Sequence, residues 1–222
     1  MHAPLLPFFQ AMTRFLYRRQ TVPTTITVRK FTCKSFDGHA LPLELFSPQA
    51  LVGAAPCILF LHGGAFTLPA TNFHKKLMAA YALGSSARVL FVDYRLVPKY
   101  RFPYGLEDCF AAYAYMVEHA KELGIDVRKI AICGDSAGGA LAAGLTHLIR
   151  DRNLPKPLFQ MLIYPVLDAR QLTNSMKRFT DTPIWNARQN KKMWDLYTGS
   201  RGDDASVSPA QATPFKGLPQ GY

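Results

Sequence analysis

Short, mostly apolar runs separated by stretches of helical spacing constrain the fold of this chain more than any other feature. The runs cover residues 57–61, 89–92, 129–133 and 159–164. They lack the alternation of apolar and polar side chains that a half-exposed strand requires, so we expect strands buried on both faces. Helices are expected near 73–84, 105–123 and 136–150. The pattern predicts an α/β fold, with a mostly parallel central sheet and helices on both faces.

The segments outside this pattern are of different kinds. Residues 5–19 place apolar side chains along one helical face, which fits a core helix, a lid helix or a membrane-surface helix. Residues 25–47 predict a strand pair with a turn at Asp37-Gly38. Residues 168–207 are polar and contain both tryptophans, and we expect them to form an insertion over the sheet rather than part of it.

Composition indicates a single globular domain across residues 1–222. Hydrophobic side chains make up 49% of the chain, which excludes a disordered protein, and no internal repeat is present. The 26 Lys and Arg residues outnumber the 15 acidic ones, giving a net charge of +11. These basic residues are scattered and are not interleaved with stacking aromatic residues, so we expect no nucleic-acid partner.

The cysteines and the N-terminus together predict a cytoplasmic protein. The four cysteines, Cys33, Cys57, Cys109 and Cys133, form no Cys-x-x-Cys pair, so we expect reduced core residues. No Cys or His spacing is typical of zinc, so no metal site is predicted. The N-terminus lacks the cationic region of a signal peptide, and no apolar stretch is long enough to span a membrane.

The residues that carry chemistry follow the run at 129–133. Gly134-Asp-Ser136-Ala-Gly138-Gly fits the pattern Gly-x-Ser-x-Gly between a strand and a helix. Such a turn holds the serine hydroxyl above the sheet edge, at the positive end of the following helix, and small residues two positions away avoid collisions. Chance produces the pattern in about one chain in twenty-five of this composition, and its placement strengthens it. We therefore predict Ser136 as a catalytic nucleophile.

A second glycine turn lies upstream of this serine. His62-Gly63-Gly64-Ala65-Phe66 directly follows the run at 57–61. Acyl transfer needs backbone N–H groups that point at the developing oxyanion, and small residues let the backbone approach the substrate. The candidate oxyanion-hole donors are the N–H groups of Gly63, Gly64, Ala65 and Ala137. An ordinary turn at a strand end is the alternative interpretation.

Together these segments resemble the hormone-sensitive-lipase-like esterases of the α/β-hydrolase fold. The segment at 134–139 is similar to that family's serine turn. His62-Gly-Gly-Ala65 is similar to its His-Gly-Gly-Gly box, with Ala in the last place. Further similar segments are Asp93-Tyr-Arg-Leu-Val-Pro98, Phe102-Pro103, Glu107-Asp108, Ile163-Tyr-Pro-Val-Leu-Asp168, Ser208-Pro209 and Gly217-Leu-Pro219. One departure is Lys99, which stands where the family usually has an acidic residue. The resemblance extends from about residue 30 to residue 222.

This resemblance implies hydrolysis of short-chain carboxylic esters through an acyl-serine intermediate, with no cofactor. It also implies a cap built from residues 1–24 and 168–207. Residues with a structural role at the site would be His62, Gly134, Asp135 and Gly138. Aromatic residues that could line an acyl pocket, or simply pack the core of the cap, are Phe8, Phe9, Trp185, Trp194 and Tyr197.

A base that would activate Ser136 is not evident in the sequence. The only later histidine, His147, lies about 16 Å along the same predicted helix. Neither His74 nor His119 stands at a triad position of the family. There the catalytic Asp lies beyond the strand that follows the Gly-Leu-Pro segment, here at 217–219, and the His comes later still. We therefore expect a chain that lacks the C-terminal strands and, by itself, hydrolyses esters weakly or not at all.

Two interpretations outside esterase catalysis stay open at this point. A catalytically silent protein on the same fold would bind a small ligand without turnover, as in the related gibberellin receptors, which lack the catalytic histidine. A basic interaction module would bind an anionic partner through the net charge of +11. The oligomeric state is also open, with a homodimer as one alternative.

Overall fold

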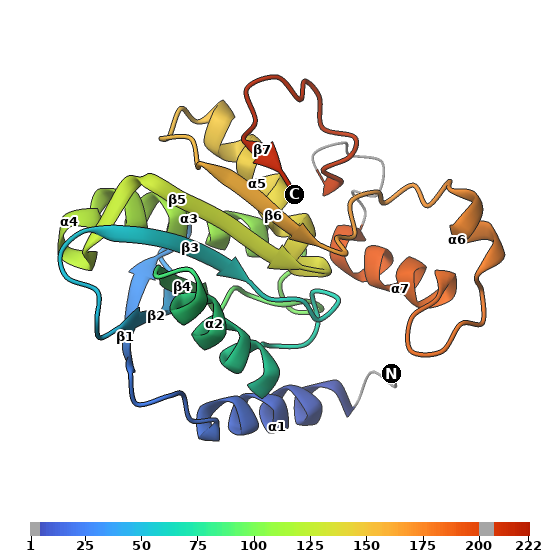
Figure 1. Cartoon of the computed structure of the whole chain (residues 1–222). Helices are drawn as coiled ribbons and strands as arrows, with labels where there is room; N and C mark the ends of the chain where they lie inside the picture. Colours follow the sequence, from blue (N-terminus) through green and yellow to red (C-terminus); the bar gives the residue numbers. More distant parts are fainter. Residues whose placement is uncertain (1–4, 200–206) are drawn as a thin grey trace.

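One mixed sheet forms the centre of the molecule. The computed structural model describes residues 5–199 and 207–222 (Figure 1). Within these residues the strand order is β1-β2-β4-β3-β5-β6-β7. The strands are β1 Ile26–Lys34, β2 Ala40–Pro48, β3 Ala55–Leu61, β4 Arg88–Val92, β5 Ile125–Asp135, β6 Phe159–Ile163 and β7 Gln220–Gly221. From β4 to β7 neighbouring strands are parallel, and only β2 pairs antiparallel, with β1 and β4. The mostly parallel sheet is confirmed.

Helices cover both faces of this sheet, each over its own apolar core. The helices are α1 Leu6–Arg19, α2 Asn72–Gly84, α3 Tyr104–Glu118, α4 Ala120–Leu123, α5 Ala137–Asp151, α6 Asn174–Arg178 and α7 Ala187–Thr198. On one face Met78 of α2 packs among Phe60 and Phe91 of the sheet. On the other face α3 and α5 bury side chains such as Tyr113 and Leu141. Apolar and polar side chains therefore do not alternate along these strands because the strands are buried on both faces, as the sequence indicated.

Two details differ from the expected elements. The helix expected at 105–123 is interrupted at His119, which separates α3 from α4. Ala120 and Leu123 of α4 enter the same apolar core as α3, so the apolar spacing continues through the break and hides it. Gly124 ends α4 with a positive φ of 67°, a conformation that glycine adopts without strain. The second difference is the strand β7, which no apolar run in the sequence indicates.

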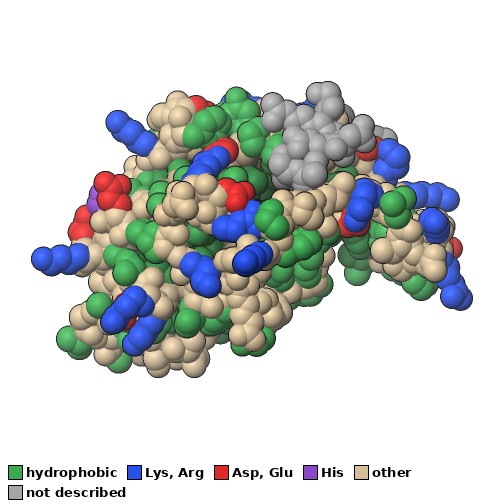
Figure 2. All heavy atoms as spheres, turned by 90° about the horizontal axis from the view of Figure 1, so that it is seen from above, with side chains coloured by type: hydrophobic (Ala, Val, Ile, Leu, Met, Phe, Trp, Pro, Cys, Tyr) green, Lys and Arg blue, Asp and Glu red, His purple; other side chains and the backbone are tan. Residues whose placement is uncertain are grey.

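Residues 168–199 contribute no strand to the sheet. They contain α6 and α7, which lie to one side of the sheet, past the ends of β5 and β6 (Figure 1, orange). Residues 200–206 of the expected insertion and residues 1–4 of the expected N-terminal cap segment fall outside the described residues. Figure 2 shows Lys and Arg side chains dispersed over one face of the molecule rather than gathered into a single patch.

Candidate active site

Ser136 occupies the turn between β5 and α5 and has a backbone conformation that is unusual for a residue with a side chain. Its φ is 51° and its ψ is −115°. A Cβ on Gly134 would collide with the carbonyl group of Gly138, so only glycine fits there. The N–H of Ser136 donates to the carbonyl oxygen of Ile163 at 2.9 Å, which ties the turn to the end of β6. The Ser136 side chain is half-buried and therefore reachable from solvent.

The glycine turn after β3 lies against this serine turn. β3 and β5 are parallel neighbours, with Leu61 opposite Gly134, so the residues that follow each strand meet at the same edge of the sheet. A Cβ on Gly138 would collide with the carbonyl oxygen of Leu61 and approach that of His62 to 2.6 Å. The glycine at position 138 therefore allows the two turns to make close backbone contact.

Backbone strain continues through the residues after Gly63. The φ values of Gly64, Ala65 and Phe66 are 127°, 53° and 56°, all in the left-handed range. The N–H groups of Thr67 and Leu68 both donate to the carbonyl oxygen of Gly64, at 2.9 and 2.8 Å. Residues with side chains rarely hold such angles unless the surroundings impose them, and such strain gathers at functional sites.

The four expected oxyanion-hole donors are not equivalent. The N–H of Gly63 donates to Asp135 Oδ1 at 2.9 Å, so this group is already used within the protein. The N–H groups of Gly64, Ala65 and Ala137 donate to no acceptor among the described residues. They belong to the two adjacent turns, and Ala137 is the first residue of α5.

Asp135 links three segments of the chain beside the serine. Its second carboxylate oxygen lies 3.3 Å from His74 Nε2, while the Nδ1 of that histidine accepts the N–H of Thr71 at 3.0 Å. His74 therefore carries its proton on Nε2 and donates it to Asp135. Burial raises the pKa of Asp135, but the hydrogen bonds from His74 and from the N–H of Gly63 outweigh burial and leave the pKa below its usual value.

His62 is fully buried at the start of the glycine turn. Its ring stacks on Tyr94 at a centroid distance of 4.4 Å, and its Nδ1 lies 2.6 Å from the carbonyl oxygen of Gly63. The Tyr94 hydroxyl donates to the His62 carbonyl oxygen at 2.6 Å. Burial, together with the nearby His74, lowers the pKa of His62 to about 3, so the ring is neutral at pH 7. The His62 ring thus contacts both Gly63 of the glycine turn and Tyr94, which follows β4.

The aromatic residues of the expected cap divide into two groups. Trp194 and Tyr197 of α7 are buried, and Tyr197 stacks on Phe66 at 3.8 Å, so they pack α7 onto the glycine turn. The other three are open to solvent: Phe8 at 65%, Phe9 at 38% and Trp185 at 39% exposed. Core packing is thus the interpretation that fits Trp194 and Tyr197.

Comparison with known families decides what this chain is related to. A family model described as the alpha/beta hydrolase fold matches residues 58–222, which include both glycine turns and the serine. The chain belongs to the α/β-hydrolase fold family. The predicted α/β-hydrolase fold and the resemblance to the family's esterases and lipases are both confirmed.

Two relatives of this α/β-hydrolase are named as ester hydrolases. It is 40% identical over 180 residues to the ethyl acetate hydrolase of Pseudomonas putida, covering 78% of this chain and 56% of the relative. It is 34% identical over 195 residues to the esterase LipI of Mycobacterium tuberculosis, covering 85% and 61%. The chain therefore spans a little over half the length of these two curated relatives.

Solved structures agree with the family. The bacterial heroin esterase superposes with a TM-score of 0.89 at 33% identity, covering 98% of this chain and 72% of that one. The thermostable esterase of Pseudomonas putida ECU1011 superposes with a TM-score of 0.86 at 29% identity, covering 97% and 69%. The arrangement of sheet and helices is therefore that of α/β-hydrolase esterases.

No described histidine of this α/β-hydrolase forms a hydrogen bond with Ser136. His147 lies in α5 with its ring 5.8 Å from that of Phe215. His119 stacks on Tyr115 near the start of β5, at the opposite end of that strand from the serine. The interaction of His74 with Asp135 was not predicted from the sequence, since it joins residues 61 positions apart.

We expect the buried, neutral His62 to make the stability of this α/β-hydrolase depend on pH. The pKa of His62 is about 3 in the fold against 6.5 when unperturbed. Between these two pH values His62 is protonated in the unfolded chain but neutral in the folded protein. The contribution of neutral His62 to the free energy of unfolding is therefore complete above pH 6.5 and is lost as the pH falls toward 3. The free energy of unfolding should therefore fall by up to about 1.4 kcal/mol per pH unit. Urea titrations at pH 7, 6 and 5 measure it.

A variant at this position isolates the effect from other titrating groups. His62→Asn should remove the His62 part of the slope between pH 7 and 5. An unaltered slope in His62→Asn would contradict the assignment of this pH dependence to His62.

Proposed function

We propose that this protein hydrolyses carboxylic esters with Ser136 as the nucleophile. The observation that carries the proposal is the strained Ser136 turn lying against a second strained turn whose N–H groups at Gly64 and Ala65 have no acceptor among the described residues. Membership of the α/β-hydrolase family and relatives named as ester hydrolases support it. In the reaction Ser136 Oγ attacks the carbonyl carbon, the alcohol leaves, and water then releases the acid from the acyl-serine.

The oxyanion hole in this proposal consists of the N–H groups of Gly64, Ala65 and Ala137. They come from two turns that the β3–β5 register places side by side, and Ala137 adds the positive end of the α5 dipole. The N–H of Gly63 is not part of this oxyanion hole, because it donates to the Asp135 carboxylate at 2.9 Å. Asp135, with His74, then fixes the position of the glycine turn relative to Ser136. His62 and the glycines at 134 and 138 keep the structural roles expected of them.

The substrates that fit this proposal are small esters with short acyl chains. The relatives include a protein named for ethyl acetate hydrolysis, and α7 is packed onto the glycine turn through the stacking of Tyr197 on Phe66. Residues 5–24 and 168–199 would act as the described parts of a cap. No described histidine is bonded to Ser136, so the 222 residues alone would turn esters over slowly.

Labelling with a fluorophosphonate tests whether Ser136 is activated. The protein translated from the complete reading frame should react at Ser136, detected by mass spectrometry of the peptide that contains it, while the same protein unfolded in urea should not react. The alternative is a silent binding protein, which the absence of a described histidine at Ser136 favours. Binding of an ester ligand without labelling or turnover would establish that alternative instead.

A further inference from the structure

The helix α1 carries its apolar face outward, away from the rest of the protein. The face consists of side chains three or four residues apart, which line up along one side of a helix. Their exposed fractions are 65% for Phe8, 54% for Phe15, 52% for Leu5, 49% for Leu16, 41% for Met12 and 38% for Phe9. We call these six residues the outward face of α1. In an ordinary surface helix such residues would be turned into the core.

The side of α1 that contacts the protein is largely polar. Gln10 Nε2 donates to the carbonyl oxygen of Thr67 at 2.6 Å, and Arg14 forms an ion pair with Asp93 at 2.5 Å. Tyr17, one of two buried residues in α1, donates from its hydroxyl to Glu44 at 2.8 Å.

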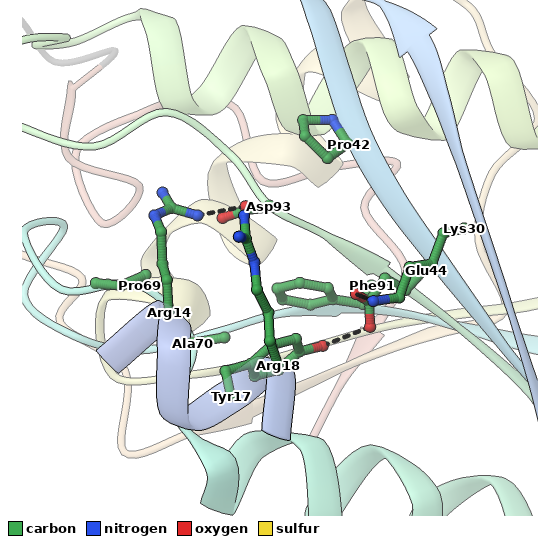
Figure 3. A pocket seen from close by; sticks show the side chains of 10 residues that line it. All are labelled: Arg14, Tyr17, Arg18, Lys30, Pro42, Glu44, Pro69, Ala70, Phe91 and Asp93. Atoms are coloured by element: carbon green, nitrogen blue, oxygen red, sulfur yellow. Dashed lines mark hydrogen bonds and ion pairs between the residues drawn. The ribbon is translucent and has the colours of Figure 1, made fainter. Parts of the chain in front are cut away.

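These contacts fix which way the helix faces. Figure 3 shows Arg14 and Tyr17 pointing from α1 toward these two carboxylates, around a cavity of about 200 Å³ that none of the serine-turn residues lines. The ion pair and the hydrogen bonds therefore hold the helix in a fixed rotation, and this rotation turns the outward face to solvent.

The charges on this segment are of one sign. Residues 5–20 contain Arg14, Arg18 and Arg19 and no acidic residue, within a chain of net charge +11. Arg19 lies at the end of the outward face, with its guanidinium carbon 4.6 Å from the centre of the Phe15 ring. A long side chain beside an exposed aromatic ring can rest on apolar surroundings while its charge reaches an anion above them.

We propose that the outward face of α1 binds the surface of an anionic lipid bilayer. Phe8, Phe15 and Leu16 would enter the boundary between head groups and acyl chains, and Arg19 would meet the lipid phosphates. A second copy of this chain is the less favoured occupant, because residues 5–20 of both copies carry positive and no negative charge. Among the described residues no helix is long and apolar enough to cross a membrane.

Co-sedimentation with vesicles tests this proposal. The protein should sediment with vesicles made of equal parts phosphatidylcholine and phosphatidylglycerol, bind pure phosphatidylcholine vesicles less, and dissociate as salt is added. The variant Phe8→Ser/Phe15→Ser should bind the mixed vesicles at least about tenfold more weakly, because two buried aromatic contacts are lost. The matched control Val52→Ser/Leu158→Ser changes two side chains that are also exposed, on other parts of the surface, and should bind like the parent.

Three results would overturn the proposal. The first is no sedimentation with either vesicle. The second is an equal loss of binding in the control variant. The third is a dimer in analytical ultracentrifugation that Phe8→Ser/Phe15→Ser dissociates, which would assign the outward face to a second copy. Thermal melting of each variant confirms that it is folded.

Discussion

Replacing Ser136 with alanine should lower kcat/KM for p-nitrophenyl acetate by about ten-thousand-fold or more, which leaves only the hydrolysis that an oxyanion hole can promote without a nucleophile. The hydroxyl is the atom that would bond to the acyl carbon, so its loss removes the covalent step itself. Initial rates, followed by the absorbance of released p-nitrophenol at saturating and subsaturating ester concentrations, give kcat and KM separately. The assay uses the protein translated from the complete reading frame.

The matched control is Ser85→Ala, which removes an exposed hydroxyl that only donates to the carbonyl oxygen of Tyr81 at 2.7 Å. It should leave kcat and KM unchanged. Turnover in Ser136→Ala within tenfold of the parent would contradict the assignment of the nucleophile. Unfolding midpoints that match the parent for both variants would exclude misfolding as the cause of any loss.

The layers of this fold could be predicted from sequence because burial on two faces leaves a direct mark. A strand covered on both sides needs apolar side chains at consecutive positions, and the run at 57–61 shows this. The two-residue strand β7 leaves no such mark, since its pairing with β6 is made by the backbone of Gln220 and Gly221. The break at His119 is hidden for a related reason, because side chains on both sides of it enter one core.

The serine turn could be predicted because its geometry restricts residue type at fixed local spacing. Glycine is needed at 134 and 138 by contacts with residues only a few positions away or on the adjacent strand. The pairing of Asp135 with His74 has no such local spacing, because it depends on where α2 packs on the sheet. The same holds for the N–H of Gly63: sequence places it in the turn, and only the structure shows that Asp135 accepts it.

Replacing Asp108 with alanine should destabilise the fold by about 3–5 kcal/mol, because it leaves the Arg95 guanidinium without its main partner. Asp108 is fully buried, and it accepts from Arg95 Nε at 2.9 Å, from Nη2 at 2.7 Å and from the Arg95 backbone N–H at 2.9 Å. The other carboxylate that Arg95 binds, that of Asp37, lies nearer the surface. For a chain of this size the loss corresponds to roughly 6 °C or more in the unfolding midpoint. Thermal and urea denaturation measure it.

An exposed ion pair in the same protein serves as the control for this prediction. Lys191 and Asp195 lie 2.8 Å apart on α7, with both side chains mostly open to water. Asp195→Ala should therefore cost under about 0.5 kcal/mol, since water and salt screen this pair. Asp108→Asn should fall between the two, because an amide oxygen still accepts from Arg95 but carries no charge. Equal small losses in Asp108→Ala and Asp195→Ala would show that the Arg95 charge finds other compensation in the fold.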